Sequence, residues 1–359
     1  MCQLNRIATL ALRKPPTEIS LSANLYLPDD YTGIQPVRFL ALLLLLASLA
    51  GDSAGGDASS FVIGDVLSPR TGPTQPDRPV VRLLVTQFAY PNHHYPLIDR
   101  TISEFRSIFG AGNFEAMAFS GETSDINQAD FVLSSAGTYL RMRSEGARDL
   151  ATAVSSLAPN PNQAEGSLFV VLKQSANLQT FEDLKGKRVT ITGLNAFSGY
   201  HIALGEIFKR GEDPDRFFGA VVTSGHDMRH ELTLLRQGQA DVAILRTCFL
   251  EELEASGHDI SDLRPVAVRA APHVDACISS TDRYPNWTLF ATPRATPEQA
   301  RIATTALLSM PTEKDGLHWS VASDFSSIDR LYRDLRLGPY EYLRVWTLEL
   351  SFSEDDCTS

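Results

Sequence analysis

The stretch Arg188-Val-Thr-Ile-Thr-Gly-Leu-Asn-Ala-Phe-Ser-Gly-Tyr200 decides the fold class, because it reads as a short strand, a small-residue turn and a helix start. Its β-branched residues are typical of a buried strand, and apolar residues at helical spacing continue to Arg210, where Gly211 ends the pattern. The next units repeat the alternation, with strands predicted at 220–223 and 240–245 around a helix at 227–237. This alternation predicts an α/β protein.

The same pattern occurs on both sides of this region. Upstream we expect strands at 80–85, 130–134 and 167–173 and helices at 97–109 and 138–143. Downstream we expect strands at 264–268 and 287–291 that return to the first set, a helix at 297–308 and a helical region at 328–348. Two sets of similar size predict two lobes, each a sheet flanked by helices. The predicted first lobe is 80–172 with 266–350, the second is 173–265, and the crossings lie near Leu172 and Val266.

Composition narrows the function classes. The chain has 359 residues, of which 43% are hydrophobic and 21% charged, enough for two packed lobes. A formal net charge of -11 and the lack of a basic stretch argue against nucleic acid as a partner. Four cysteines without a CxxC pair are too few for a disulfide scaffold and indicate no zinc ribbon. We expect no cofactor and no metal site, because His93 and His94 lack a third ligand at helical spacing.

The apolar run 39–50 is too short to cross a bilayer as a helix and has the features of a signal-peptide core. Arg38 precedes it, and Ser48 and Ala50 occupy the small-residue positions of a cleavage site. We therefore expect a signal peptide at 37–50, an extension at 1–36 that lies before the true start at Val37, and a flexible Gly/Ser/Pro-rich leader at 51–79. A buried helix or an uncleaved anchor is the alternative. The signal interpretation places the protein in the periplasm.

Polar residues follow the strands of the second set, where ligands gather in open α/β sheets. Ser198 and Gly199 begin one helix, and His226 and Asp227 begin the next, so free backbone N–H groups there favour an anion. Arg246 ends the third strand, and its guanidinium can hold two oxygens of an anion at once. Ordinary N-caps and a surface arginine are the alternatives.

The chain resembles the periplasmic phosphate/phosphite/phosphonate-type substrate-binding proteins of ABC transporters, which have two lobes of the type II fold. The resemblance covers about Val80 to Leu348. It is carried by the following segments: Ala129-Asp-Phe-Val-Leu-Ser-Ser-Ala-Gly-Thr-Tyr-Leu140, Gly166-Ser-Leu-Phe-Val-Val171, Phe181-Glu-Asp-Leu-Lys-Gly-Lys-Arg-Val189, Ser198-Gly-Tyr200, Gly225-His-Asp227 and Gly238-Gln-Ala-Asp-Val-Ala243.

The resemblance implies a cleft between the lobes that closes by hinge motion on a small anionic ligand. The residues that it places at this cleft are Gln87, Ser134, Ser135, Tyr139, Ser198, Gly199, Tyr200, His226, Asp227 and Arg246. In the family, hydroxyl residues at the Ser198 loop hold the anion and an acidic residue near Asp227 meets an amine. This chain has Asn195-Ala-Phe-Ser198 in that loop, with fewer hydroxyls, which counts against a phosphonate ligand. For Gln87 and Tyr139, a turn residue and a core tyrosine are the alternatives.

A closer resemblance is to the periplasmic sensor region of tetrathionate-type sensor histidine kinases. It is carried by Leu245-Arg-Thr-Cys-Phe-Leu-Glu-Glu-Leu253, Cys277-Ile-Ser-Ser-Thr-Asp-Arg-Tyr-Pro-Asn-Trp287 and Tyr332-Arg-Asp-Leu-Arg-Leu-Gly-Pro-Tyr-Glu-Tyr-Leu-Arg344. The sequence contains no phosphotransfer or ATP-binding motif, so we expect a monomeric binding protein, without kinase activity, that serves a separate ABC permease or sensor histidine kinase. The membrane would be met only through the signal segment.

Cys248 and Cys277 lie in two of these segments. In an oxidising compartment we expect a disulfide or a buried thiol pair; the alternative is a reactive pair near a sulfur oxyanion, because a thiolate can attack a sulfur–sulfur bond. Two other function classes stay open. One is an enzyme with Cys248 as nucleophile and His226 as base, and the other is an interaction module without a small ligand.

Overall fold

The computed structural model describes residues 7–13, 24–25, 80–86, 95–119, 126–225, 227–270, 277–314, 316–344 and 347–353. The chain divides into two compact units, one of residues 1–77 with 344–359 and one of residues 78–343. The predicted signal peptide and leader, 37–79, lie outside the described residues. Within the described parts, every helix is too short or too polar to cross a membrane.

The smaller unit contains a three-stranded antiparallel sheet in the order β14-β1-β2. Its strands are β1 (Ile7–Arg13), β2 (Asn24–Leu25) and β14 (Thr347–Ser353). Two of them fall in the segment predicted to be an extension. The third begins where helix was predicted to 348, so the helical prediction ends too late.

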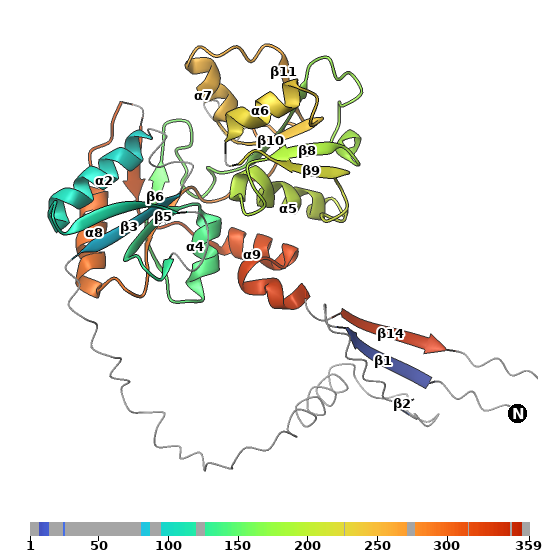
Figure 1. Cartoon of the computed structure of the whole chain (residues 1–359), viewed down its shortest axis with the longest axis horizontal. Helices are drawn as coiled ribbons and strands as arrows, with labels where there is room; N and C mark the ends of the chain where they lie inside the picture. Colours follow the sequence, from blue (N-terminus) through green and yellow to red (C-terminus); the bar gives the residue numbers. More distant parts are fainter. Residues whose placement is uncertain are drawn as a thin grey trace, which may run out of the picture. The chain divides into compact units, whose positions relative to one another are not determined.

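The first lobe of the larger unit is built on a six-stranded mixed sheet in the order β13-β6-β12-β5-β3-β4 (Figure 1). Its strands are β3 (Val81–Thr86), β4 (Phe114–Phe119), β5 (Phe131–Ser134), β6 (Arg148–Val154), β12 (Thr288–Ala291) and β13 (His318–Ser320). β3 pairs in parallel with both β4 and β5, and the remaining pairs are antiparallel.

Helices cover both faces of this sheet. α2 (Pro96–Phe109) and α8 (Pro297–Ser309) share one apolar core with β3, β5 and β12, and α4 (Ala136–Arg143) packs in a different core. α2 starts at a proline whose missing N–H costs nothing in the first turn, and Phe105 packs edge-on against Phe131 from β5. A capping box of Thr296 and Gln299 fixes the start of α8.

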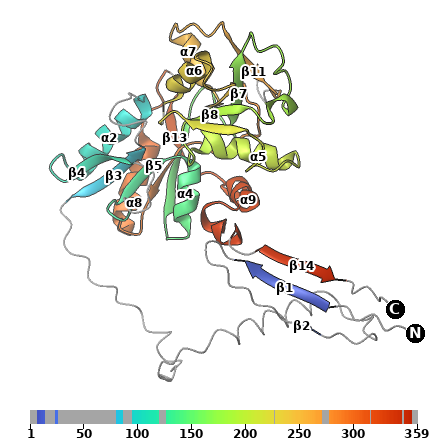
Figure 2. The same ribbon diagram turned by 45° about the vertical axis from the view of Figure 1, so that its right-hand side comes forward.

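The second lobe is built on a five-stranded sheet in the order β11-β7-β10-β8-β9 (Figure 2). Its strands are β7 (Ser167–Leu172), β8 (Arg188–Ile191), β9 (Ala220–Thr223), β10 (Val242–Arg246) and β11 (Leu263–Val266). A π-helical turn, η4 (Phe197–His201), leads into α5 (Ile202–Lys209) on one face. α6 (Met228–Arg236) and α7 (Phe249–Ala255) cover the other face, and a 3-10 turn, η3, spans Glu182–Leu184.

The predicted α/β architecture of two sheets flanked by helices is confirmed, with one correction to the strand assignment. β11 was expected to return to the first lobe, but it pairs antiparallel with β7 in the second sheet, and β7 itself belongs there. The chain therefore crosses between the lobes at 155–166 and 267–287, outside the positions predicted near Leu172 and Val266.

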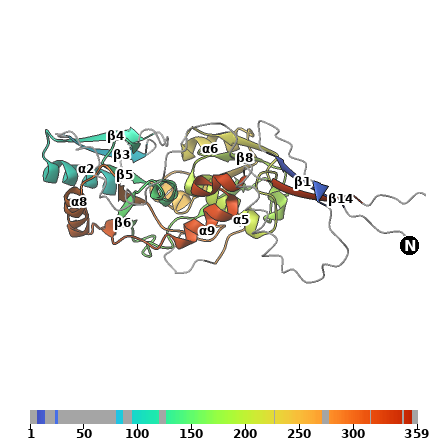
Figure 3. The same cartoon turned by 90° about the horizontal axis from the view of Figure 1, so that it is seen from below.

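α9 (Ser326–Leu335) packs against both lobes, next to these crossings. It packs against α4 of the first lobe and α5 of the second, and Figure 3 shows α9 beside α5. Its buried residues, Ile328, Leu331, Tyr332 and Leu335, recur at helical spacing and join the core that contains α4 and α5. A short 3-10 turn, η5 (Gly338–Arg344), follows it.

A buried carboxyl group under α6 gives the second lobe a pH-dependent stability. Glu231 is fully buried, and neither carboxyl oxygen has a hydrogen-bond partner among the described residues. Burial, followed by repulsion from Asp227, raises the pKa of Glu231 well above its ordinary value, and Ser224 opposes the shift only partly. Because the folded state keeps a proton that the unfolded state releases above about pH 4.5, this group lowers stability as pH rises.

We therefore expect Glu231→Gln to stabilise the protein at about pH 8 by roughly 1–3 kcal/mol, with the gain shrinking toward about pH 4.5. Chemical denaturation at the two pH values measures this, with the exposed Glu254→Gln on α7 as the control for a generic change of charge. An equal effect of Glu231→Gln at both pH values would show that Glu231 does not hold its proton in the folded state.

Candidate functional site

Three predicted site residues lie at one edge of the second sheet. β10, β8 and β9 run parallel to one another, so their carboxyl ends meet at the same edge. Arg246 ends β10, the turn with Ser198 follows β8, and Asp227 follows β9. The sheet order thus places these residues at the position where open α/β folds bind ligands.

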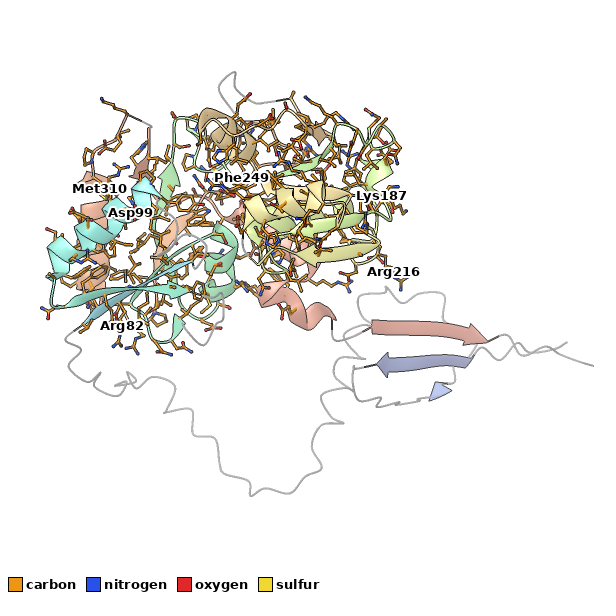
Figure 4. All side chains as sticks on the ribbon, turned by 45° about the horizontal axis from the view of Figure 1, so that its top comes forward. Arg82, Asp99, Lys187, Arg216, Phe249 and Met310 are labelled. Carbon is orange, nitrogen blue, oxygen red and sulfur yellow. A yellow bond between two sulfur atoms is a disulfide. The ribbon has the colours of Figure 1, made fainter. Side chains whose placement is uncertain are left out.

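Arg246 is the centre of this edge. Its side chain is 16% exposed and makes a two-pronged ion pair with Glu252 from α7, with one Nη1–Oε1 distance of 3.0 Å. Nη1 also donates to the carbonyl of Thr247 at 3.1 Å, and the ring centroid of Phe249, labelled in Figure 4, lies 5.7 Å from the guanidinium carbon. Burial alone would lower the pKa of Arg246, but Glu252 outweighs it and raises the pKa. The guanidinium is therefore permanently charged and held by a carboxylate.

A buried acid lies behind the arginine. Glu165 comes from the crossing that leads into β7, and burial raises its pKa, although Arg246 and a hydrogen bond from the Ser198 side chain act in the opposite direction. A buried carboxyl with a raised pKa adds less negative charge to the site than an ionised one. The composition and motif patterns did not single out Glu165 or Glu252. The only signal was that Glu252 lies six residues after Arg246, within the quoted segment 245–253.

The turn with Ser198 is held in place by its own neighbours. Ser167 donates its hydroxyl to the carbonyl of Ser198 at 2.5 Å, which joins the turn to β7. A Cβ at Gly199 would overlap Thr192 Oγ1, so this position admits only glycine without rearrangement. His201 lies within hydrogen-bond distance of the Leu194 carbonyl at 2.9 Å and of the Tyr332 hydroxyl at 3.0 Å. The loop is therefore a rigid wall of the site.

Cys248 and Cys277 are joined by a disulfide with a Cα–Cα distance of 4.9 Å. Cys248 precedes α7 with a φ of 71°, a left-handed conformation that is strained for a residue with a Cβ. The bond ties the segment that carries Arg246 to the second crossing. In this state neither sulfur is a nucleophile, because both are covalently used.

The second crossing brings buried hydroxyl groups next to the same edge. Ser279 donates its hydroxyl to the carbonyl of Ser167. The N–H of Ser167 donates to the hydroxyl of Thr281 at 3.0 Å. Thr247 is 4% exposed, and its hydroxyl has no hydrogen-bond partner among the described residues. A buried hydroxyl beside Arg246 that lacks a partner is suited to contact a ligand oxygen. The quoted segment 245–253 contained Thr247, but no pattern distinguished it from a structural threonine.

The predicted first-lobe residues Ser134 and Ser135 lie at the end of β5 and just after it. Ser134 accepts from Thr86 at 2.8 Å and donates to Thr138 at 3.0 Å, and Ser135 is the N-cap of α4. Tyr139, which was expected to face the cleft, is instead buried in the core, where its hydroxyl donates to Asp149 at 2.7 Å. Its ring packs against those of two phenylalanines because it lies on the inner face of α4. Gln87 lies outside the described residues.

The remaining predicted residues have mixed positions. Asp227 is the N-cap of α6 and accepts from the N–H of Arg229 at 2.8 Å, so its carboxylate has a structural role that the sequence left open. Tyr200 is half-buried beside the α5 core, where burial raises its pKa. His226, the base of the enzyme alternative, lies outside the described residues.

Tyr95 brings the first lobe close to Arg246, and Trp287 packs beside Tyr95. Tyr95 immediately precedes α2 and lies close enough to raise the pKa of Arg246, and its ring centroid is 6.3 Å from that of Trp287. No sequence pattern indicated a function for either residue, because both lie at the boundaries of predicted elements. Across the described residues, no group of three or more His, Cys, Asp or Glu side chains is arranged to hold a metal ion.

A family model described as the periplasmic phosphonate substrate-binding protein of ABC transporters matches residues 120–331, more than half of the chain. The chain is 28% identical over 177 residues to the tetrathionate sensor histidine kinase TtrS of Salmonella typhimurium, which covers 49% of this chain. The chain spans only 29% of the length of that kinase.

Solved structures show a similar fold at low identity. XAC2383 from Xanthomonas citri, bound to ATP, aligns over 74% of this chain and 98% of its own with a TM-score of 0.54 and 16% identity. PhnD1 from Prochlorococcus marinus, in complex with methylphosphonate, aligns over 72% and 99% with a TM-score of 0.53 and 14% identity. The predicted two-lobed fold of the type II periplasmic binding proteins is thereby confirmed.

Proposed function

Because this chain belongs to the phosphonate-type periplasmic substrate-binding proteins of ABC transporters, we propose that it captures a small oxyanion between its two lobes. The observation that carries the proposal is the buried guanidinium of Arg246 at the carboxyl edge of the second sheet. A fixed, permanently charged fork can bind two oxygens of one anion once the anion displaces Glu252 from it, and the Thr247 hydroxyl beside it, which has no hydrogen-bond partner among the described residues, can bind a third. Binding proceeds without covalent chemistry.

The ligand that we propose is a sulfur oxyanion of the tetrathionate or thiosulfate class, with phosphonate or phosphite as the alternative. Apart from the phenol of Tyr200, the loop 194–200 has one hydroxyl group, that of Ser198. The phosphonate-type pattern has several hydroxyl residues in this loop. The chain also resembles a protein named as a tetrathionate sensor. A sulfonate-type group needs fewer hydroxyl donors when a guanidinium supplies two N–H groups in one plane.

A thermal-shift screen of the folded, disulfide-containing protein tests this function. We expect tetrathionate or thiosulfate to raise the melting temperature, because a ligand that binds only the folded state stabilises it, while sulfate and phosphate have smaller effects. The variant Arg216→Ala is the control and should show the same ligand-induced shifts as wild type. Its side chain is 87% exposed and lies away from Phe249, which packs near Arg246, in Figure 4. No shift with any sulfur or phosphorus oxyanion would contradict the proposal, and turnover of the anion would favour the enzyme class instead.

We further propose that the loaded protein acts as a periplasmic monomer that delivers its ligand to a separate ABC permease or sensor histidine kinase. The family assignment supports the periplasm and the permease, and the similarity to a sensor kinase supports the second partner. Cell fractionation and light scattering on the purified protein test location and oligomeric state. Recovery only in the cytoplasm, or a stable oligomer, would contradict these statements.

A further inference from the structure

A second cavity lies away from Arg246, on the side of the lobe crossings. Its volume is about 450 Å³, within the range of small-molecule sites. Its walls come from the end of α5, from both crossings between the lobes and from α9, and α5 and α9 lie side by side in Figure 3. Its charged lining residues are Lys209, Arg269, Asp282, Arg283, Arg330 and Asp334.

Arg246 is not among the residues that line this cavity. Lys209 ends α5, whereas Ser198 lies in the turn that begins it, a distance of about 16 Å along the helix at 1.5 Å per residue. Tyr284 fills the space between, with its hydroxyl accepting from Lys209 at 3.0 Å and its ring packed edge-on against Phe197. The two sites adjoin at Ser279, which lines the cavity and whose hydroxyl lies beside Gly166 together with that of Thr247, but their cationic residues differ.

Two of the four cations in the cavity are neutralised by carboxylates. Lys209 pairs with Asp282 at 2.6 Å. Arg269 pairs with the same Asp282 and with Glu206, which is 1% exposed. Because the charges of Lys209 and Arg269 are balanced by these carboxylates, the two side chains have little capacity to bind a further anion.

The other two cations have no carboxylate partner in the part of the chain that the structure describes. Arg330 is exposed at the cavity and makes no ion pair or side-chain hydrogen bond with any described residue. Arg283 is half-buried and donates to the carbonyl of Cys277, with no carboxylate of the described chain at ion-pair distance. Burial lowers the pKa of Arg283, and the field of Glu251 offsets this only in part. Uncompensated guanidinium groups on the wall of a cavity favour an anionic occupant.

We propose that this cavity is a second anion site, which binds a small polyanion with more than one phosphate-type oxyanion group through Arg330 and Arg283. The two guanidinium groups come from different elements, α9 and the second crossing, so an anion with two charged groups engages both. The lining carries four cations and two carboxylates, and Glu206 behind Arg269 adds a third carboxylate, so the cavity keeps a small positive excess in a chain whose net charge is -11. The site lies between the segments that connect the two lobes, so a molecule bound there contacts elements joined to both lobes.

Calorimetric titration of the intact, disulfide-containing protein with inorganic pyrophosphate tests the site. Arg330→Gln is expected to weaken pyrophosphate binding about tenfold or more, since a charge-assisted hydrogen bond is lost. Because Arg330 is exposed, this substitution leaves the fold intact, which an unchanged melting temperature verifies. The matched control is Arg333→Gln, an exposed arginine on the same helix that pairs with Asp329 outside the cavity, and it should change binding less than twofold.

Two further measurements separate this site from the first one. Arg246→Ala should leave pyrophosphate binding within about twofold while removing the sulfur-oxyanion shift, and orthophosphate should bind more weakly than pyrophosphate because it offers one group. The proposal is overturned if wild-type protein does not bind pyrophosphate, if Arg330→Gln binds it normally, if Arg246→Ala abolishes it, or if orthophosphate binds equally well.

Discussion

Replacement of Arg246 with alanine is expected to weaken binding of the oxyanion at least about 100-fold, which is roughly 3 kcal/mol. The substitution removes both prongs of the guanidinium and leaves the ligand facing Glu252 and Glu165 without a compensating cation. Arg246→Lys keeps the charge but loses the planar fork, so we expect an intermediate loss of about tenfold. Isothermal titration with the anion identified by the thermal-shift screen measures both values.

The matched control for this experiment is Arg264→Ala. Arg264 lies on β11 of the same sheet and donates to the carbonyls of Ser175 and Leu178, so its loss costs stability without touching the oxyanion site. We expect its affinity for the anion to stay within about twofold of wild type. If Arg264→Ala weakens binding as much as Arg246→Ala, the loss reflects general destabilisation and the role assigned to Arg246 is wrong.

Removal of the disulfide is expected to produce the largest change in folding stability. Cys248 and Cys277 close a loop with a sequence separation of 29 residues, and restricting the unfolded chain to such a loop contributes about 3–4 kcal/mol in the chain-entropy description. The double substitution Cys248→Ala and Cys277→Ala should therefore lower the free energy of unfolding by that amount. Urea denaturation with and without reductant measures it.

The reductant provides an internal control. Wild-type protein in reductant should approach the stability of the double variant, while the variant itself should be insensitive to reductant. Cys357→Ala leaves the bridge intact and should match wild type in both conditions. A loss below about 1 kcal/mol in the double variant would show that the bridge contributes little to folding stability.

The regular elements of the second lobe were predictable because their signal is local. β-branched strands such as β8 and helices with apolar residues at helical spacing such as α6 are encoded in a few consecutive residues. The same reasoning found the residues at the carboxyl edge of the sheet, since helix starts and a strand-end arginine are visible in one dimension. The structure also contains the disulfide between Cys248 and Cys277, one of the two structural states that were predicted for this pair.

The parts that failed depend on contacts between distant segments. β11 carries the same strand signal in either lobe, and only its register with β7 assigns it to the second sheet. Tyr139 is equally compatible with a core and with a cleft until the inner face of α4 and the position of Asp149 are known. Glu252 and Glu165 became site residues only when tertiary structure brought two carboxyl groups to one guanidinium. Interactions between charged residues from different segments leave no periodic pattern in the sequence, so sequence analysis could not predict them.

The most direct measurement compares oxyanion affinity between wild type and Glu252→Gln. In the structure Glu252 occupies the guanidinium fork that the ligand needs, so its negative charge competes with the anion. Neutralising it should strengthen binding at least about fivefold, because a like charge at contact distance is removed. Glu254→Gln on the same helix, exposed and outside the fork, should leave the affinity unchanged. Weaker binding by Glu252→Gln would contradict an anion site centred on Arg246, because the carboxylate would then be needed to hold a cationic or neutral ligand.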